Sequence, residues 1–216
     1  MGIQERKERE KETRRKQITA AAKRVISVKG LNKTTMKDIA EEAELSPGAI
    51  YLYFKNKEEL YASLSLKPLR YLNVRLSDVG SNDKGLVYEQ RLAAFKEALY
   101  DVYQFEPFLL SNILHLQSND TLKNLSPVIL SQIKDLYDRL FGKLTEIFEE
   151  GIKNSHFISG SPKDLSNIIW ALFLGLVFWE DSKRIIYNHN ENNDQLKLTL
   201  ETAFGLFSQG LNDNMR

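Results

Sequence analysis

Apolar residues return every three or four positions along most of this chain, which is the spacing of one buried face of an α-helix. One such stripe comprises Ile18, Ala21, Ala22, Val25 and Ile26. A second stripe comprises Leu92, Phe95, Leu99 and Val102, and its helix must end or kink before Pro107. A third comprises Ile129, Ile133, Leu136, Leu140, Leu144 and Ile147. No segment alternates apolar and polar residues as a half-buried strand does, so we predict an all-α protein with loops at 81–85, 118–126 and 155–162.

Residues 168–179, with the sequence IIWALFLGLVFW, are apolar on every side of a helix. The stretch is shorter than the roughly 20 residues that cross a bilayer, and no membrane partner is expected. Protein must then cover it, either inside its own domain or against a second copy of the chain. Residues 196–211 supply an apolar partner helix.

Three helix-start signals lie close together within residues 34–60. They are the pairs Thr35 with Asp38, Ser46 with Pro47, and Asn56 with Glu59, in each of which the first residue can cap a helix. Helices are expected at 36–43 and 47–53, and Glu44 and Leu45 leave only a short turn between them. This pattern predicts a helix-turn-helix whose exposed helix starts suit phosphate. The structural alternative is a three-helix knot in which the caps serve folding only.

Charge is divided along the chain although its net value is only +1. Residues 1–67 hold 15 Lys and Arg against 10 Asp and Glu, whereas the remainder holds 15 against 19. The basic region coincides with the predicted helix-turn-helix, which favours nucleic acid as its partner. Residues 5–16 are almost wholly charged, and they are either an arm that reaches an adjacent groove or a solvated helical extension; we favour the extension.

A long series of residues in this region resembles the amino-terminal signature of the tetracycline-repressor (TetR) family. The series is Gly30, Thr34, Thr35, Asp38, Ile39, Ala40, Ala43, Leu45, Ser46, Gly48, Ile50, Tyr51, Tyr53, Phe54, Lys57, Glu58, Glu59 and Leu60. The resemblance implies a homodimeric, all-helical, one-component regulator, most often a repressor, which binds palindromic double-stranded operator DNA. It also implies two domains, a helix-turn-helix domain at 1–60 and an effector-binding and dimerisation domain at 61–216.

Carried over by position, the resemblance implies a set of DNA-binding residues. They are Thr35, Lys37, Ser46, Pro47, Gly48, Ala49, Tyr51, Tyr53 and Lys57. Thr35 and Lys57 are expected at phosphates, Tyr51 and Tyr53 on the DNA backbone, and Lys37 at a base edge or a phosphate. Ser46, Gly48 and Ala49 are expected at the floor of the groove. The structural alternative is that the two tyrosines cover Phe54 and that Lys57 is merely solvated. Residues 46–54 hold no Arg, Asn or Gln, so DNA shape is expected to share in the discrimination.

Glu44 departs from the family pattern, which usually has glycine there because the turn needs a positive φ. A glutamate in that conformation costs about 1 kcal/mol, unless the turn itself differs.

The second domain is expected to hold a small, apolar or aromatic effector and the dimer interface. Candidate ligand-binding residues are Phe95, Tyr103, Phe108, His115, Tyr137, Trp170 and Phe173, for each of which ordinary core packing is the alternative. Candidate interface residues on the last two helices are Trp170, Phe173, Leu174, Val177, Phe178, Leu200, Phe204 and Phe207. The resemblance places these helices in a four-helix interface between subunits.

Other functional classes find little support in the sequence. The chain has no cysteine, so disulfides and thiolate metal sites are excluded, and a cytoplasmic location is expected in the absence of an apolar signal segment. His115, His156 and His189 lie in unrelated contexts, and no metal, cofactor or catalytic arrangement is predicted. The competing hypothesis to a regulator is a helical protein-interaction module whose first domain is only structural.

Overall fold

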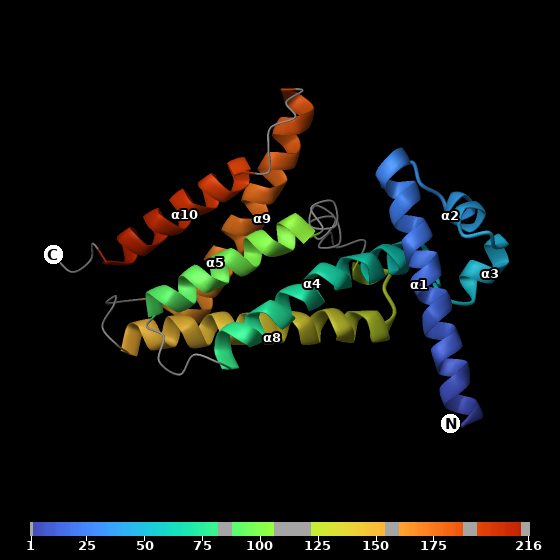
Figure 1. Ribbon diagram of the computed structural model, residues 1–216, viewed down its shortest axis with the longest axis horizontal. Helices are drawn as coiled ribbons and strands as arrows, with labels where there is room; N and C mark the ends of the chain where they lie inside the picture. Colours follow the sequence, from blue (N-terminus) through green and yellow to red (C-terminus); the bar gives the residue numbers. More distant parts are fainter. Residues whose placement is uncertain (1, 82–87, 106–121, 154–159, 188–193, 213–216) are drawn as a thin grey trace. The chain divides into compact units, whose positions relative to one another are not determined.

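The computed structural model describes residues 2–81, 88–105, 122–153, 160–187 and 194–212. All regular secondary structure in these residues is helical, which confirms the predicted class (Figure 1). The helices are α1 (Ile3–Lys29), α2 (Met36–Glu42), α3 (Pro47–Tyr51), α4 (Lys57–Ser81), α5 (Tyr88–Phe105), α8 (Pro127–Lys153), α9 (Pro162–Ile186) and α10 (Asp194–Asn212). Within these residues no helix combines the length and apolar composition that a membrane-spanning segment needs.

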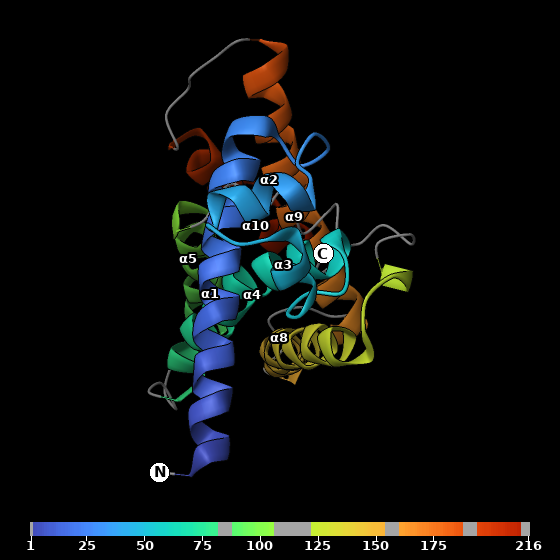
Figure 2. The same ribbon diagram turned by 90° about the vertical axis from the view of Figure 1, so that its right-hand side faces the viewer.

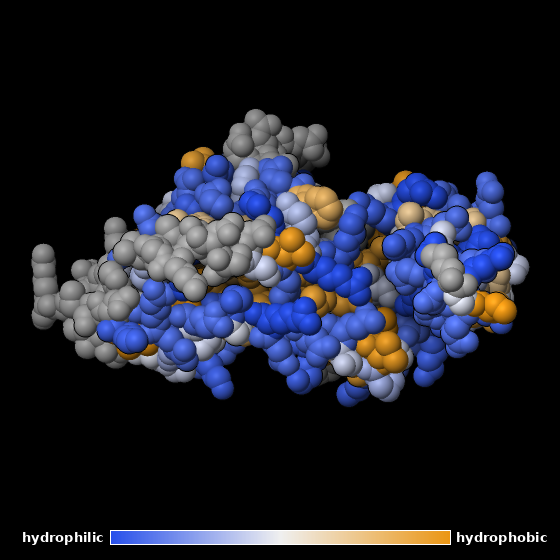
Figure 3. All heavy atoms as spheres, turned by 60° about the horizontal axis from the view of Figure 1, so that its bottom comes forward, coloured by the Kyte–Doolittle hydropathy of each residue, from blue (hydrophilic) through white to orange (hydrophobic). Residues whose placement is uncertain are grey.

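The described residues divide into two compact units. The first unit holds residues 2–66 and 122–131, and the second holds the described residues of 67–105 and 132–212. The helices α4 and α8 each begin in the first unit and continue in the second. The face shown in Figure 3 is largely hydrophilic, with its apolar side chains in separate groups.

The core of the first unit is built on the carboxy-terminal half of α1. The predicted stripe on this helix is buried throughout, and α2 packs against it, with α3 next in line (Figure 2). Ile39, Ile50 and Phe54 complete this core with at most 1% of their surfaces exposed. The helix α1 ends at Lys29, and its C-cap is Gly30, whose φ of 77° suits glycine and whose N–H donates to the carbonyl of Ile26 at 2.8 Å.

The second unit is a bundle in which α10 packs against both α5 and α9. The rings of Phe95 on α5 and Phe204 on α10 lie 6.5 Å apart, and both side chains are buried. All six predicted core positions of α8 are buried. The helix α5 is described as far as Phe105, and Pro107, where an end or kink is predicted, lies outside the described residues.

The apolar stretch of α9 is only half covered. Ile169, Phe173 and Val177 are completely buried, whereas Ile168, Phe178 and Trp179 have about half of their surfaces exposed. One face of this helix therefore fills the core, and another lies open in the single chain, so cover by a second copy of the chain stays a prediction.

Candidate nucleic-acid interface

The start of α2 is held by a reciprocal cap between Thr35 and Asp38. The Asp38 N–H donates to the Thr35 hydroxyl at 3.2 Å, and the Asp38 carboxylate accepts from the Thr35 N–H at 2.9 Å. Lys29 also donates to this carboxylate at 2.8 Å. The hydrogen bond from Lys29 and those from Thr35 lower the pKa of Asp38 to about 2. The predicted cap is confirmed, and it leaves the exposed Lys37 beside the helix start.

The turn between α2 and α3 has the left-handed residue that the family pattern requires. Glu44 has φ of 56°, which makes it the non-glycine residue with positive φ in the described part of the chain. The Leu45 N–H donates to the Ala40 carbonyl at 2.8 Å, which closes the end of α2. The turn therefore keeps its left-handed residue, and the Glu44 side chain adds the steric cost of a positive φ.

The start of α3 offers a small and open surface. Ser46 accepts the Ala49 N–H at 3.2 Å, Pro47 occupies the first helical position, and both residues are exposed. A methyl group added at Gly48 would meet nothing within 4 Å. Because no bulky side chain covers this helix start, another molecule can approach its backbone closely.

The end of α3 is shorter than predicted. The helix stops at Tyr51 rather than Tyr53, and the N–H groups of Tyr53 and Phe54 both donate to the Ile50 carbonyl, at 2.9 and 3.0 Å. Tyr51 has 52% of its surface exposed, whereas Tyr53 is partly buried.

Arg15 of α1 contacts this end of α3, and the sequence analysis missed it. Its guanidinium donates to the Tyr53 carbonyl and lies 4.2 Å from the centre of the Phe54 ring. The interpretation of residues 5–16 as a solvated extension is therefore wrong for Arg15, which is partly buried. No local pattern marks this contact, since the two partners lie 38 residues apart.

The start of α4 is tied to the segment before α8. As predicted, Asn56 caps the helix by accepting the Glu59 N–H at 2.8 Å. The buried Glu59 carboxylate accepts the Lys55 N–H at 2.6 Å and the Ser126 hydroxyl at 2.5 Å. The Asn56 amide donates to the Asn124 carbonyl at 2.9 Å. These long-range partners were not visible in the sequence.

Lys57 occupies the first turn of α4, where its ammonium lies 5.1 Å from the centre of the Tyr61 ring. Burial lowers the pKa of Lys57. The predicted DNA-binding residues thus all lie on the first unit, at or beside the starts of α2, α3 and α4, and at the end of α3.

The predicted ligand-binding residues that the structure describes belong to the second unit, where four of them are buried and Tyr137 is partly exposed. Phe95, Tyr103 and Phe173 are fully buried, and Tyr137 packs edge-on against Trp170 with ring centres 6.0 Å apart. The buried indole N–H of Trp170 has no hydrogen-bond partner among the described residues. Phe108 and His115 lie outside those residues.

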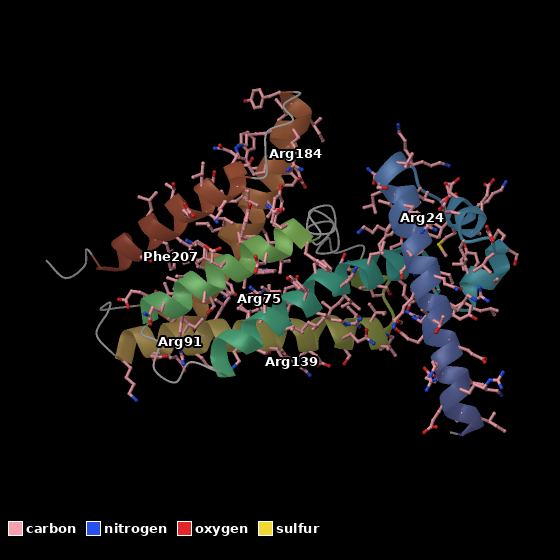
Figure 4. All side chains as sticks on the ribbon, in the orientation of Figure 1. Arg24, Arg75, Arg91, Arg139, Arg184 and Phe207 are labelled. Atoms are coloured by element: carbon pink, nitrogen blue, oxygen red, sulfur yellow. The ribbon has the colours of Figure 1, made fainter. Side chains whose placement is uncertain are left out.

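Arg184, which Figure 4 labels on α9, gives the buried Tyr103 a polar partner. It donates to the Tyr103 hydroxyl at 2.8 Å, and burial is the main cause that raises the pKa of Tyr103. The sequence analysis missed Arg184, because the two residues lie 81 positions apart.

Most of the predicted interface residues also fill the core of their own subunit. This group comprises Trp170, Phe173, Leu174, Val177, Leu200 and Phe204, each with at most 5% of its surface exposed. Phe207 is partly buried against Phe148, with ring centres 5.9 Å apart, and only Phe178 of the predicted set is exposed, with 56% of its surface open.

Comparisons with known proteins agree with the helix-turn-helix geometry. A family model described as "Bacterial regulatory proteins, tetR family" matches residues 18–64. An uncharacterised HTH-type transcriptional regulator of Haemophilus influenzae is 31% identical over 137 residues, which cover 62% of this chain and 72% of that protein.

Solved structures share the fold across nearly the whole chain. The TetR family regulator PfmR from Thermus thermophilus has a TM-score of 0.68 at 20% identity, covering 90% of this chain and 98% of PfmR. FadR from Bacillus subtilis, solved in complex with stearoyl-CoA, has a TM-score of 0.63 at 20% identity, covering 87% of this chain and 96% of FadR.

Proposed function

Because this chain belongs to the TetR family of helix-turn-helix transcriptional regulators, which are not enzymes, we propose that it is a repressor with a small-molecule effector. As a homodimer in the cytoplasm, it binds a palindromic operator with its first unit and releases the DNA when the effector binds its second unit. The observation that carries the proposal is the capped, open start of α3 directly after the left-handed turn at Glu44.

The geometry supports a division of work between two lysines. Lys37 is exposed in the first turn of α2, beside the open start of α3, and we assign it to a base edge. Lys57 is held at the start of α4 by its contact with the Tyr61 ring, and we assign it to a phosphate.

Selection of duplexes bound by the purified protein, followed by binding measurements on the recovered sequence, tests this division. Lys37→Ala is expected to relax the sequence preference, whereas Lys57→Ala weakens binding to selected and random duplexes alike. Two variants that act identically on both duplexes would contradict the assignment. Failure of the wild-type protein to bind any duplex at low salt would overturn the regulator itself and favour the protein-interaction module.

A second subunit is the partner that we assign to the open face of α9. Ile168, Ala171, Gly175 and Phe178 alternate by three and four positions and are all exposed, with Trp179 beside them. On α10, Leu198 and Leu206 have 56% and 65% of their surfaces exposed. Apolar stripes of this spacing on neighbouring helices suit a four-helix contact between two copies. Most of the interface residues suggested by the sequence are buried in their own chain, so we assign the subunit contact to these exposed residues instead.

The effector is assigned to the aromatic core of the second unit, as an apolar or aromatic molecule with a hydrogen-bond acceptor. The buried indole N–H of Trp170, which has no partner in the described part of the chain, supports an acceptor, and the surrounding rings of Tyr137 and Phe173 support an apolar body. The stearoyl-CoA bound by Bacillus subtilis FadR makes a fatty acyl compound the first probe.

Thermal-shift measurements with stearoyl-CoA, aromatic acids and hydrophobic cations test this assignment. A stabilising compound is expected to lose its effect in Trp170→Phe, which keeps an aromatic ring and removes the donor. Stabilisation by strongly hydrophilic charged compounds alone would contradict it.

A further inference from the structure

The amino-terminal half of α1 carries a basic face that the family description does not cover. The family model matches residues 18–64, so the helical turns before Ile18 lie outside it. The spacing that buries Ile18, Ala21 and Val25 continues toward the amino terminus, alternately by four and three positions, through Arg14, Lys11 and Lys7. The face that is apolar and buried in the second half of α1 is therefore basic and exposed in its first half.

This basic face borders a groove of about 650 Å³ that the end of α3 closes on its other side. Lys7, Arg9, Lys11 and Arg14 line the groove from α1, opposite Leu52 and Tyr53. Glu10 is the acidic residue of the lining, and it pairs with Arg6 at 2.9 Å. The other carboxylates of this stretch, Glu5, Glu8 and Glu12, do not line it. The groove is therefore strongly basic, although the stretch as a whole is mixed in charge.

The extension is a formed helix with a fixed position against α3. Its first turn is closed by the Gly2 N–H, which donates to the Glu5 carboxylate at 2.9 Å. Where the extension leaves the core, Arg15 binds the Tyr53 carbonyl and covers the Phe54 ring. Lys7, Lys11 and Arg14 are thus held in a row instead of moving as a loose arm.

We propose that this groove binds the phosphate backbone of duplex DNA outside the bases read by α2 and α3. Lys7 to Arg14 span about 10 Å of helix, over which one strand of B-DNA presents about three phosphates. Lys7 and Lys11 have no ion pair among the described residues, so their charges are available to the backbone. The inference rests on the proposed DNA-binding function and extends the contacted DNA beyond the helix-turn-helix.

Salt titration of duplex binding tests the proposal. The triple variant Lys7→Ala, Lys11→Ala, Arg14→Ala keeps helix propensity, because alanine is the strongest helix former. On a mixed-sequence duplex, the magnitude of its negative slope of log K against log salt is expected to decrease by about 0.9 for each lost phosphate contact, and so by nearly 3. Lys11→Ala alone should decrease this magnitude by about 0.9, whereas Lys16→Ala, which removes the same charge outside the groove lining, should leave it unchanged.

The outcomes separate this inference from the function on which it rests. A triple variant with the wild-type slope, measured where Lys57→Ala still weakens binding, overturns the groove alone. Equal effects of Lys11→Ala and Lys16→Ala on the slope also overturn it, because they would mean that only the overall charge of the protein matters. A wild-type protein that binds no duplex overturns both the function and the groove.

The absence of native cysteine permits a positional test as well. An iron–EDTA cleavage reagent attached to Gln4→Cys is expected to cut the selected duplex in the flanks of the recognised sequence. Cuts confined to its centre, or no cuts from a protein that binds this duplex, would overturn the proposal.

Discussion

At the residue scale, Glu44 is the clearest conflict between local preference and fold. Its φ of 56° is available to glycine without a steric penalty, whereas a side chain there costs about 1 kcal/mol. We expect Glu44→Gly to stabilise the first unit by about 0.5–1 kcal/mol. Hydrogen exchange of the amides in residues 36–54 is the appropriate measurement, because both tryptophans, Trp170 and Trp179, lie in the second unit and their fluorescence does not report on the first.

The matched control for this change is Glu41→Gly, an exposed position inside α2. There the same substitution should destabilise the unit by about 1 kcal/mol, because glycine weakens a helix interior. If both variants lose protection to the same extent, the strain assigned to Glu44 does not exist.

Asp38 makes the stability of the first unit depend on pH in the acidic range. Its folded pKa, about 2, lies below its ordinary value of 3.8, so the carboxylate stabilises the fold fully above that ordinary value. This contribution is lost as the pH falls from about 4 to 2. In hydrogen exchange, the difference between wild type and Asp38→Asn should be constant near neutral pH and shrink across that window. A difference that stays constant across that window would refute the assignment.

At the element scale, Arg15 decides how α1 meets α3. Arg15→Ala removes a charged hydrogen bond to the Tyr53 carbonyl and the stacking on Phe54, and at this partly exposed site we expect a loss of about 1–2 kcal/mol. The neighbouring Lys16→Ala should change stability by less than about 0.5 kcal/mol. Faster exchange of the amides of residues 47–54 in Arg15→Ala alone is the expected result. Similar exchange in both variants would show that Arg15 stabilises this segment no more than a solvated residue does.

The elements show which part of the fold the sequence could reveal. Caps such as Thr35 with Asp38 and Asn56 with Glu59 act within one helical turn, so their spacing alone predicted them. Arg15 with Tyr53, Ser126 with Glu59 and Arg184 with Tyr103 join positions far apart in the chain, and no local pattern encodes them. The faces of α9 were unresolved for a related reason: a stretch that is apolar all round has no periodicity to indicate which side is buried.

At the scale of the whole molecule, the exposed face of α9 carries the prediction about assembly. Phe178 leaves 56% of its surface uncovered in the single chain, and burial of such a ring at the centre of an interface contributes on the order of 2 kcal/mol. Phe178→Glu adds a charge that the interface would have to desolvate, so we expect dimer dissociation to become at least about 30-fold easier. Sedimentation equilibrium measures this shift directly.

Val128→Glu is the matched control for Phe178→Glu, because Val128 is 66% exposed on α8 and belongs to the first unit, which holds none of the proposed interface residues. It should leave the dimer intact, and unchanged circular dichroism in both variants would exclude a loss of folding. Since a palindrome is read by two linked first units, Phe178→Glu should also weaken binding to a full palindrome far more than to an isolated half-site. A wild-type protein that sediments as a monomer, or a Phe178→Glu variant that remains dimeric, would place the subunit contact elsewhere and leave the open stripe on α9 without the partner assigned to it.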